Sequence, residues 1–247
     1  MLFRSALVQP SVPQTLQWDP DEQGRTFTKI EGLSRQAMAL EPAVLVWPEG
    51  TFGLSETNYA RMIALIGKDG PDWILGADDA VAREGEGAAG ARPGLARYNA
   101  AFLRRGDGSM PPAYWKRRLV PFGEYVPLRG VLPIDRIAPG PTDFSAGPGP
   151  ATVRLPGLPP FSPLICYESV FPRAVVDPAD RPDWILVATN DAWFGTSAGP
   201  HQHFAAARLR AIEEGLPVVR VANGGISAVI DGRGHVRAAL QIGRAHV

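Results

Sequence analysis

The chain of 247 residues carries 25 lysine and arginine side chains and 25 aspartate and glutamate side chains, so its formal net charge is zero. This balance, with no block of basic residues, argues against a nucleic-acid-binding protein. The single cysteine excludes an internal disulfide framework. No run approaches the roughly 18–20 apolar residues that span a bilayer, and the apolar fraction of 45% allows a full core.

In the first part of the chain, short apolar runs alternate with segments whose apolar residues recur at helical spacing. The expected elements are a strand at Phe3–Val8, a helix at Asp21–Leu40, a strand at Ala43–Val46, a helix at Asn58–Ile66, a strand at Trp73–Gly76, a surface loop at Ala82–Gly94 and a strand at Tyr98–Leu103.

The second part continues the alternation after a connection rich in proline and glycine over residues 138–160. The expected elements are strands at Thr152–Leu155, Trp184–Ala188 and Val218–Val221, a helix at His201–Glu214 with Phe204, Ala207, Leu209 and Ile212 inward and Gly215 as its C-cap, and a hairpin of Ile226–Ile230 with His235–Leu240. The alternation predicts an α/β fold in which helices cover the faces of sheets.

Cys166, the only cysteine, follows the apolar pair Leu164–Ile165 and precedes polar residues. This pattern predicts a strand that ends in a sharp turn and presents the thiol, as in a nucleophile elbow. A free cysteine is more often a small buried apolar residue, so a chemical role needs partner residues.

Polar residues end three predicted strands, and open α/β sheets build their sites at such strand ends. They are Glu49, Cys166 and Asn190. A buried carboxylate can accept the thiol proton and a lysine can stabilise an oxyanion, so Glu49, Lys116 and Cys166 form a consistent set for acyl transfer. Two alternatives remain open at this level: Glu49 as a helix cap, and Lys116 as part of a solvated basic turn.

Histidines offer little support for a metal site. His201 and His203 alternate as two ligands could, but no second pair of ligands accompanies them. We therefore expect neither zinc nor any other cofactor.

Three short motifs resemble the signature sites of the nitrilase, or carbon–nitrogen hydrolase, superfamily. They are Trp47-Pro48-Glu49, Tyr114-Trp115-Lys116 and Cys166-Tyr167-Glu168. The longer segments Lys116–Pro127 and Asn190–His203 are most similar to the periplasmic domain of the apolipoprotein N-acyltransferase family, and the resemblance covers nearly the whole chain.

The resemblance implies a nitrilase-like α-β-β-α sandwich and an enzyme without a cofactor. The implied reaction moves an acyl chain from a phospholipid to the N-terminal diacylglyceryl-cysteine amine of a lipoprotein, through a thioester at the periplasmic face of the bacterial inner membrane. By the same resemblance, Glu49 is the general base, Cys166 the nucleophile, and Lys116 stabilises the oxyanion with the backbone N–H of Tyr167. The implied supporting residues are Trp18, Asn99, Glu124, Tyr167 and Glu168.

Full-length members of that family carry membrane helices around this domain. We therefore expect residues 1–241 to be the catalytic domain without those helices, and residues 242–247 to be a non-native tail. A soluble amidase or nitrilase with the same three residues is the main alternative. A non-enzymatic binding domain is a weaker one, because it predicts the loss of one of the three.

Overall fold

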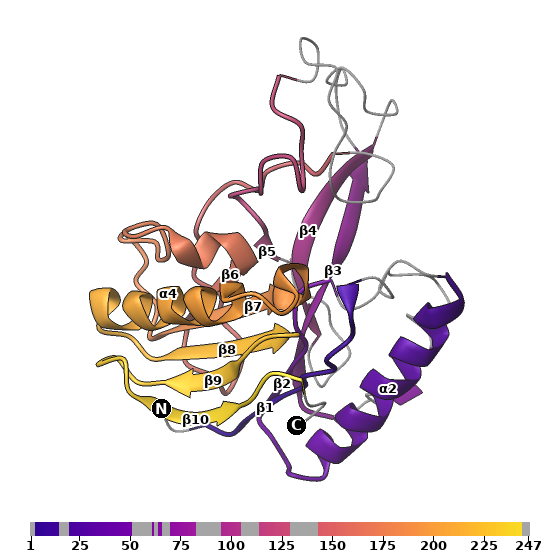
Figure 1. Ribbon diagram of the computed structural model, residues 1–247. Coiled ribbons are helices and arrows are strands. Elements are labelled where there is room, and N and C mark those ends of the chain that lie inside the picture. The colour runs from indigo at the N-terminus through magenta and orange to yellow at the C-terminus, as the bar shows by residue number, and fades with distance from the viewer. Residues whose placement is uncertain are drawn as a thin grey trace.

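The computed structural model describes residues 3–14, 20–50, 61, 64–65, 70–82, 95–104, 114–128 and 143–243. These residues form two five-stranded sheets that pack face to face (Figure 1). The strands are β1 (Ser5–Leu7), β2 (Val44–Val46), β3 (Asp72–Ala82), β4 (Leu95–Arg104) and β5 (Tyr114–Trp115) in one sheet, and β6 (Phe161–Ile165), β7 (Trp184–Asn190), β8 (Val218–Asn223), β9 (Ser227–Ile230) and β10 (Val236–Leu240) in the other.

The two sheets have the same topology. In each, the first three strands are parallel and the last two are antiparallel to their neighbours. Among the described residues, the helices with complete bounds are α2 (Pro20–Met38), α4 (Gly199–Glu214) and the short 3₁₀ turns η1 (Cys166–Val170) and η2 (Asp191–Phe194). Because β1 to β3 and β6 to β8 run parallel, the carboxyl ends of these strands share one edge of each sheet.

Apolar side chains form three layers. The central layer lies between the sheets and includes Val46, Ile74, Trp184 and Leu186. Helix α2 covers the outer face of the first sheet, and α4 covers that of the second (Figure 1). This order of layers confirms the predicted α-β-β-α sandwich.

The predicted strands recur in the structure, with two differences. Strand β3 extends to Ala82, well beyond the predicted Gly76, because its second half pairs with β4 along a long antiparallel ribbon. The predicted strand at Thr152–Leu155 is wrong, because only Val153 pairs, as an isolated bridge to Phe161. Prolines on both sides of that segment remove the donors that a longer ladder would need.

The prediction for the inward face of α4 is partly wrong. Leu209 and Ile212 are 53% and 52% exposed, whereas Ala207 is buried as expected. The buried stripe instead includes His203 and Arg210. Spacing of apolar residues could not reveal this face, because polar groups beneath the helix bind its buried polar side chains.

Two predicted elements lie outside the described residues. Only residues 61, 64 and 65 of the expected helix at Asn58–Ile66 are described, and residues 83–94 of the expected loop are not.

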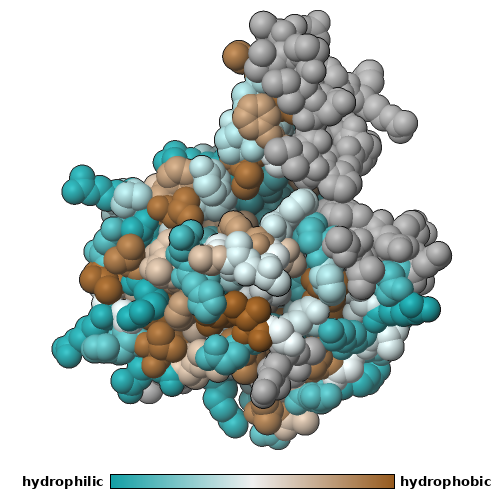
Figure 2. Space-filling view, viewed as in Figure 1, coloured by the Kyte–Doolittle hydropathy of each residue, from teal (hydrophilic) through white to brown (hydrophobic). Residues whose placement is uncertain are grey.

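On the face shown in Figure 2, apolar residues form separate small groups between hydrophilic ones. Within the described part of the chain, none of the helices is long and apolar enough to cross a membrane.

Candidate active site

Four polar side chains converge beside the carboxyl end of β2. Lys116, directly after β5, donates from Nζ to Glu49 Oε1 at 3.2 Å and to Glu124 Oε1 at 3.0 Å. Asn99 on β4 donates to the same two oxygens, each at 2.7 Å. Lys116 is only 1% exposed, so the reading of Lys116 as a solvated basic turn is wrong.

Glu49 is placed by close packing of the chain around it. Trp47 is fully buried, and its Nε1 donates to Ser34 on α2 at 3.0 Å. Gly76 on β3 permits the approach, since a Cβ there would lie 2.3 Å from the Pro48 carbonyl oxygen. The second carboxylate oxygen of Glu49 accepts the backbone N–H of Asn190 at 2.9 Å. Glu49 therefore bridges the two sheets.

Cys166 begins the 3₁₀ turn η1 with a φ of 49°, in the left-handed region. A residue other than glycine costs on the order of 1–3 kcal/mol there, so the neighbouring contacts must hold it. Glu168 supplies them, because its Oε2 accepts the N–H of Ile165 while its Oε1 accepts the Tyr114 hydroxyl, each at 2.8 Å. The predicted strand and sharp turn are therefore present, and Glu168 ties the turn to the first sheet.

A second buried polar network lies beneath this turn. The ring of His203 contacts the Cys166 carbonyl oxygen at 3.1 Å and Asp191 Oδ1 at 2.8 Å. Arg220 on β8 donates to Asp191 Oδ2 at 2.7 Å, and Ser169 contacts the His203 ring at 3.0 Å. The network thus connects the backbone of Cys166 to an ion pair in the second sheet.

Sequence reasoning missed this network and the role of Asn190 in holding Glu49. The available signal was the polar segment Asn190–His203, which contains Asn190, Asp191 and His203. Arg220 gave no signal, because a single arginine in an apolar strand has no recognisable spacing to its partner.

The charges around the thiol shift two pKa values. Burial acts to lower the pKa of Lys116, but the carboxylates of Glu49 and Glu124 outweigh it and raise that pKa, so the side chain is an ammonium. Burial raises the pKa of the Cys166 thiol, Glu49 adds to the rise and Lys116 opposes it. The resting site therefore holds a thiol beside a charged lysine and a carboxylate.

The model of the carbon–nitrogen hydrolase family matches residues 4–244 of this chain. The chain belongs to the carbon–nitrogen hydrolase family.

Two relatives named apolipoprotein N-acyltransferase are similar over most of the chain. The protein from Allorhizobium ampelinum is 41% identical over 96% of this chain, and that from Rhodopseudomonas palustris is 36% identical over 97%. The chain spans 45% and 46% of their lengths, so it is similar to about half of each. An amidase from Nesterenkonia sp. has the same fold, with a TM-score of 0.66, 18% identity, and coverage of 97% of this chain and 86% of the amidase.

The other residues singled out in the sequence lie in different places. Tyr167 contributes its ring to a cavity beside the turn. His201 is exposed on α4, and no group of three or more potential metal ligands occurs among the described residues. Trp18 lies outside the described residues.

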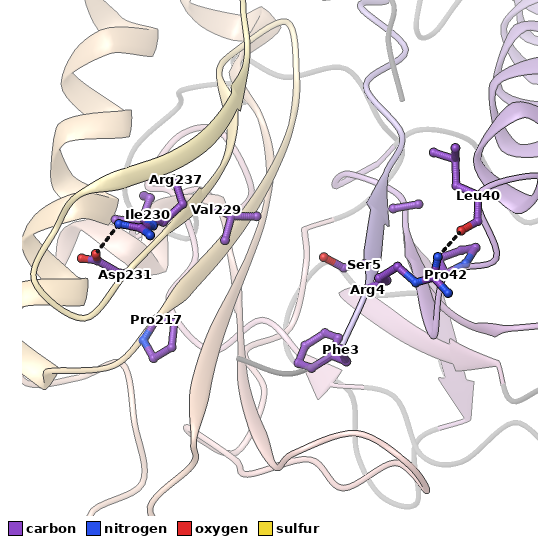
Figure 3. A pocket seen from close by; sticks show the side chains of 11 residues that line it. Phe3, Arg4, Ser5, Leu40, Pro42, Pro217, Val229, Ile230, Asp231 and Arg237 are labelled. Atoms are coloured by element: carbon purple, nitrogen blue, oxygen red, sulfur yellow. Dashed lines mark hydrogen bonds and ion pairs between the residues drawn. The ribbon is translucent and has the colours of Figure 1, made fainter.

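A separate cavity of about 720 Å³ lies away from Glu49, Lys116 and Cys166. Figure 3 shows Phe3, Arg4 and Pro42 on one side of it and Ile230, Asp231 and Arg237 on the other. Since Phe3 and Pro42 precede β1 and β2, this cavity is at the amino ends of the parallel strands. Glu49 and Cys166 are at the carboxyl ends, so we assign the cavity no part in the chemistry.

The raised pKa of Cys166 predicts slow alkylation. In the folded protein at pH 8.5, iodoacetamide should react with Cys166 at least about tenfold more slowly than in the protein unfolded in urea, because each unit of upward pKa shift lowers the thiolate fraction about tenfold. The rate in the folded protein should still rise at pH values where the unfolded rate has levelled. Mass spectrometry of timed samples measures both rates, and a plateau at the same pH would contradict the prediction.

Proposed function

We propose that this chain is the catalytic part of an apolipoprotein N-acyltransferase. It would take an acyl chain from a phospholipid, hold it as a thioester on Cys166, and transfer it to the N-terminal diacylglyceryl-cysteine amine of a lipoprotein. The site of action would be the periplasmic face of the bacterial inner membrane, where both substrates are anchored.

The observation that carries this proposal is the similarity to the named N-acyltransferases, at 41% identity over 96% of the chain. The fold alone does not distinguish an acyltransferase from an amidase. The arrangement of Glu49, Lys116 and Cys166 supports acyl transfer through a cysteine in either case.

In the first half-reaction, the Cys166 sulfur attacks the ester carbonyl of the phospholipid while Glu49 accepts the thiol proton. Proton transfer during attack suits this site, because the raised pKa of Cys166 leaves little free thiolate. The tetrahedral intermediate expels the lysophospholipid oxygen, which takes the proton back from Glu49. The products are a thioester on Cys166 and a lysophospholipid.

Lys116 would stabilise the oxyanion of that intermediate. An ammonium has three N–H donors, and among the described residues two of them are directed to Glu49 and Glu124. The third is available to the oxyanion, together with the backbone N–H of Tyr167. Such preorganised donors cost little reorganisation when charge develops.

In the second half-reaction, the lipoprotein amine attacks the thioester and Glu49 accepts a proton from the nitrogen. The intermediate then expels the Cys166 sulfur, which regains a proton as the amide forms. Atoms and charge balance, and the site returns to its resting state.

The supporting residues position these three groups. Asn99 and Glu124 hold Lys116 and Glu49 in one cluster, and Glu168 holds the turn that presents Cys166. Trp18 remains a proposed site residue by family resemblance.

The test is the intact mass of the protein after incubation with phosphatidylethanolamine in detergent. We expect the mass of one acyl chain to be added to the wild type and released by hydroxylamine, as a thioester requires. A chain that acted only on small amides would form no lipid adduct.

Cys166→Ala is the control and should show no adduct under the same conditions. An acyl adduct of equal amount on Cys166→Ala would exclude Cys166 as the nucleophile. Addition of a diacylglyceryl peptide to the acylated wild type should transfer the acyl mass to the peptide, whereas release to water alone would identify a hydrolase.

A further inference from the structure

A cavity of about 500 Å³ lies directly beside the Cys166 turn. Its wall combines cationic and aromatic side chains. Those that matter here are Arg117, Arg118, Tyr125, Phe144, Tyr167 and Phe171.

Glu168 hydrogen-bonds both to the cavity wall and to the turn that presents Cys166. Its Oε1 accepts the backbone N–H of Arg117 at 2.9 Å and that of Arg118 at 3.3 Å, while its Oε2 holds the turn itself. Both arginines also follow Lys116 directly in the chain. A ligand bound in the cavity is therefore held at a constant position relative to Cys166.

The two arginines are not neutralised within the part of the chain that the structure describes. The ion pairs there include neither Arg117 nor Arg118. Arg118 Nε is shielded from solvent and has no hydrogen-bond partner. A ligand in the cavity cannot reach this shielded atom, so an anion there would interact with the charge of the guanidinium rather than with the Nε–H.

The aromatic residues shape the rest of the cavity. The Arg118 guanidinium lies over the Phe171 ring at 4.3 Å from its centroid, and the Tyr167 ring packs against Phe171 at 4.8 Å. Stacking of this kind fixes the plane of a guanidinium, and a fixed plane favours bidentate binding of a phosphate. Free phosphate would leave the apolar wall exposed to water, whereas a phospholipid would cover it.

We propose that this cavity binds the phosphodiester group of the acyl donor, with Arg117 and Arg118 as its cations and the aromatic wall against the adjoining glycerol and acyl portion. The proposal rests on the proposed function and names the part of the substrate that orients the ester at Cys166. It makes Arg117 and Arg118 determinants of donor specificity.

The experiment compares two donors with the same acyl chains. Dihexanoyl phosphatidylethanolamine carries the phosphodiester, and dihexanoylglycerol lacks it. The rate of thioester formation on Cys166, measured by intact mass, gives a ratio between the two donors. In a variant with both Arg117→Gln and Arg118→Gln, this ratio should fall by about tenfold or more, because hydrogen bonds to a charged group are lost for one donor only.

Arg233→Gln is the matched control, because Arg233 is an exposed arginine in the turn between β9 and β10. The control should keep the wild-type ratio. A double variant with an unchanged ratio would overturn the proposal. A double variant whose kcat for the phosphatidylethanolamine donor fell while its KM stayed unchanged would also overturn it, because the arginines are proposed to supply binding.

A binding measurement separates this proposal from the proposed function. Calorimetric titration of Cys166→Ala with dihexanoyl phosphatidylethanolamine, below its micelle concentration, should show binding that the added arginine substitutions weaken by about tenfold or more. This result would support phosphodiester binding in the cavity even if the wild type forms no thioester. If Cys166→Ala bound inorganic phosphate as tightly as the lipid, the claim that the aromatic wall contacts the lipid would be overturned. If the arginine substitutions left the affinity for the lipid unchanged, the whole proposal would be overturned.

Discussion

Glu49→Gln is expected to lower the rate of thioester formation by about 10²–10⁴-fold, the usual contribution of a general base. The same substitution should make Cys166 react faster with iodoacetamide at neutral pH. The two rates are predicted to move in opposite directions. Unfolding would move each rate in the same direction as the substitution, so urea denaturation must first show that the variant is as stably folded as the wild type.

The reason lies in the charges that act on the thiol. The negative charge of Glu49 adds to the raised pKa of Cys166, and the positive charge of Lys116 opposes it. Glutamine removes the first and keeps the second, so the thiol ionises more readily. It also removes the proton acceptor that attack on an ester needs.

Thioester formation is followed by intact mass, and alkylation by the rate of carbamidomethyl addition at pH 7. Glu22→Gln on α2 is the matched control, because half-buried Glu22 pairs with the exposed Arg25, and it should leave both rates unchanged. If Glu49→Gln lowered both rates to the same extent, Glu49 would act by holding the site together rather than by accepting a proton.

Asp191→Asn is expected to lower the free energy of unfolding by about 3–5 kcal/mol, the usual cost of removing one partner of a buried ion pair. Asp191 and Arg220 are both fully buried, and asparagine has almost the same shape as aspartate. The substitution therefore leaves the guanidinium of Arg220 buried without its counter-charge. Space is also restricted there, since a Cβ at Gly225 would lie 2.1 Å from Asp191 Oδ2.

Urea denaturation at pH 7, followed by tryptophan fluorescence, measures this difference. Asp180→Asn is the matched control, because Asp180 pairs with Arg154 on the exposed surface and its loss should leave the midpoint unchanged. Equal midpoints for Asp191→Asn and the wild type would show that the buried pair contributes no net stability.

The contribution of Asp191 depends on pH in a known direction. Burial acts to raise the pKa of Asp191, but His203 and Arg220 outweigh it and hold the pKa below its ordinary value. A carboxylate with a lowered pKa stabilises the folded state above the ordinary aspartate pKa of about 3.9 and loses that effect as the pH falls toward the folded value. The denaturation curves of wild type and Asp191→Asn should therefore converge below about pH 3.9, and a constant difference would contradict this explanation.

Local patterns in the chain are sufficient for much of the fold. The parallel strands contain short apolar runs, so β2, β6 and β7 could be located from Ala43–Val46, Leu164–Ile165 and Trp184–Ala188. A polar residue of the site, Glu49, Cys166 or Asn190, follows each run within three residues. Strand register and turn chemistry act over a few residues, which is why these features can be read from the sequence.

The sequence by itself determined the α/β class, the positions of the strand ends and the identities of Glu49, Lys116 and Cys166 as residues suited to acyl transfer. Only the tertiary structure decided that Lys116 lies between two carboxylates, that His203 faces inward and that Arg220 contacts both His203 and Asp191. The physical reason is that these contacts join residues of separate elements whose side chains gain free energy only after the sheets have packed. Their spacing along the chain therefore carries no signal of their contact.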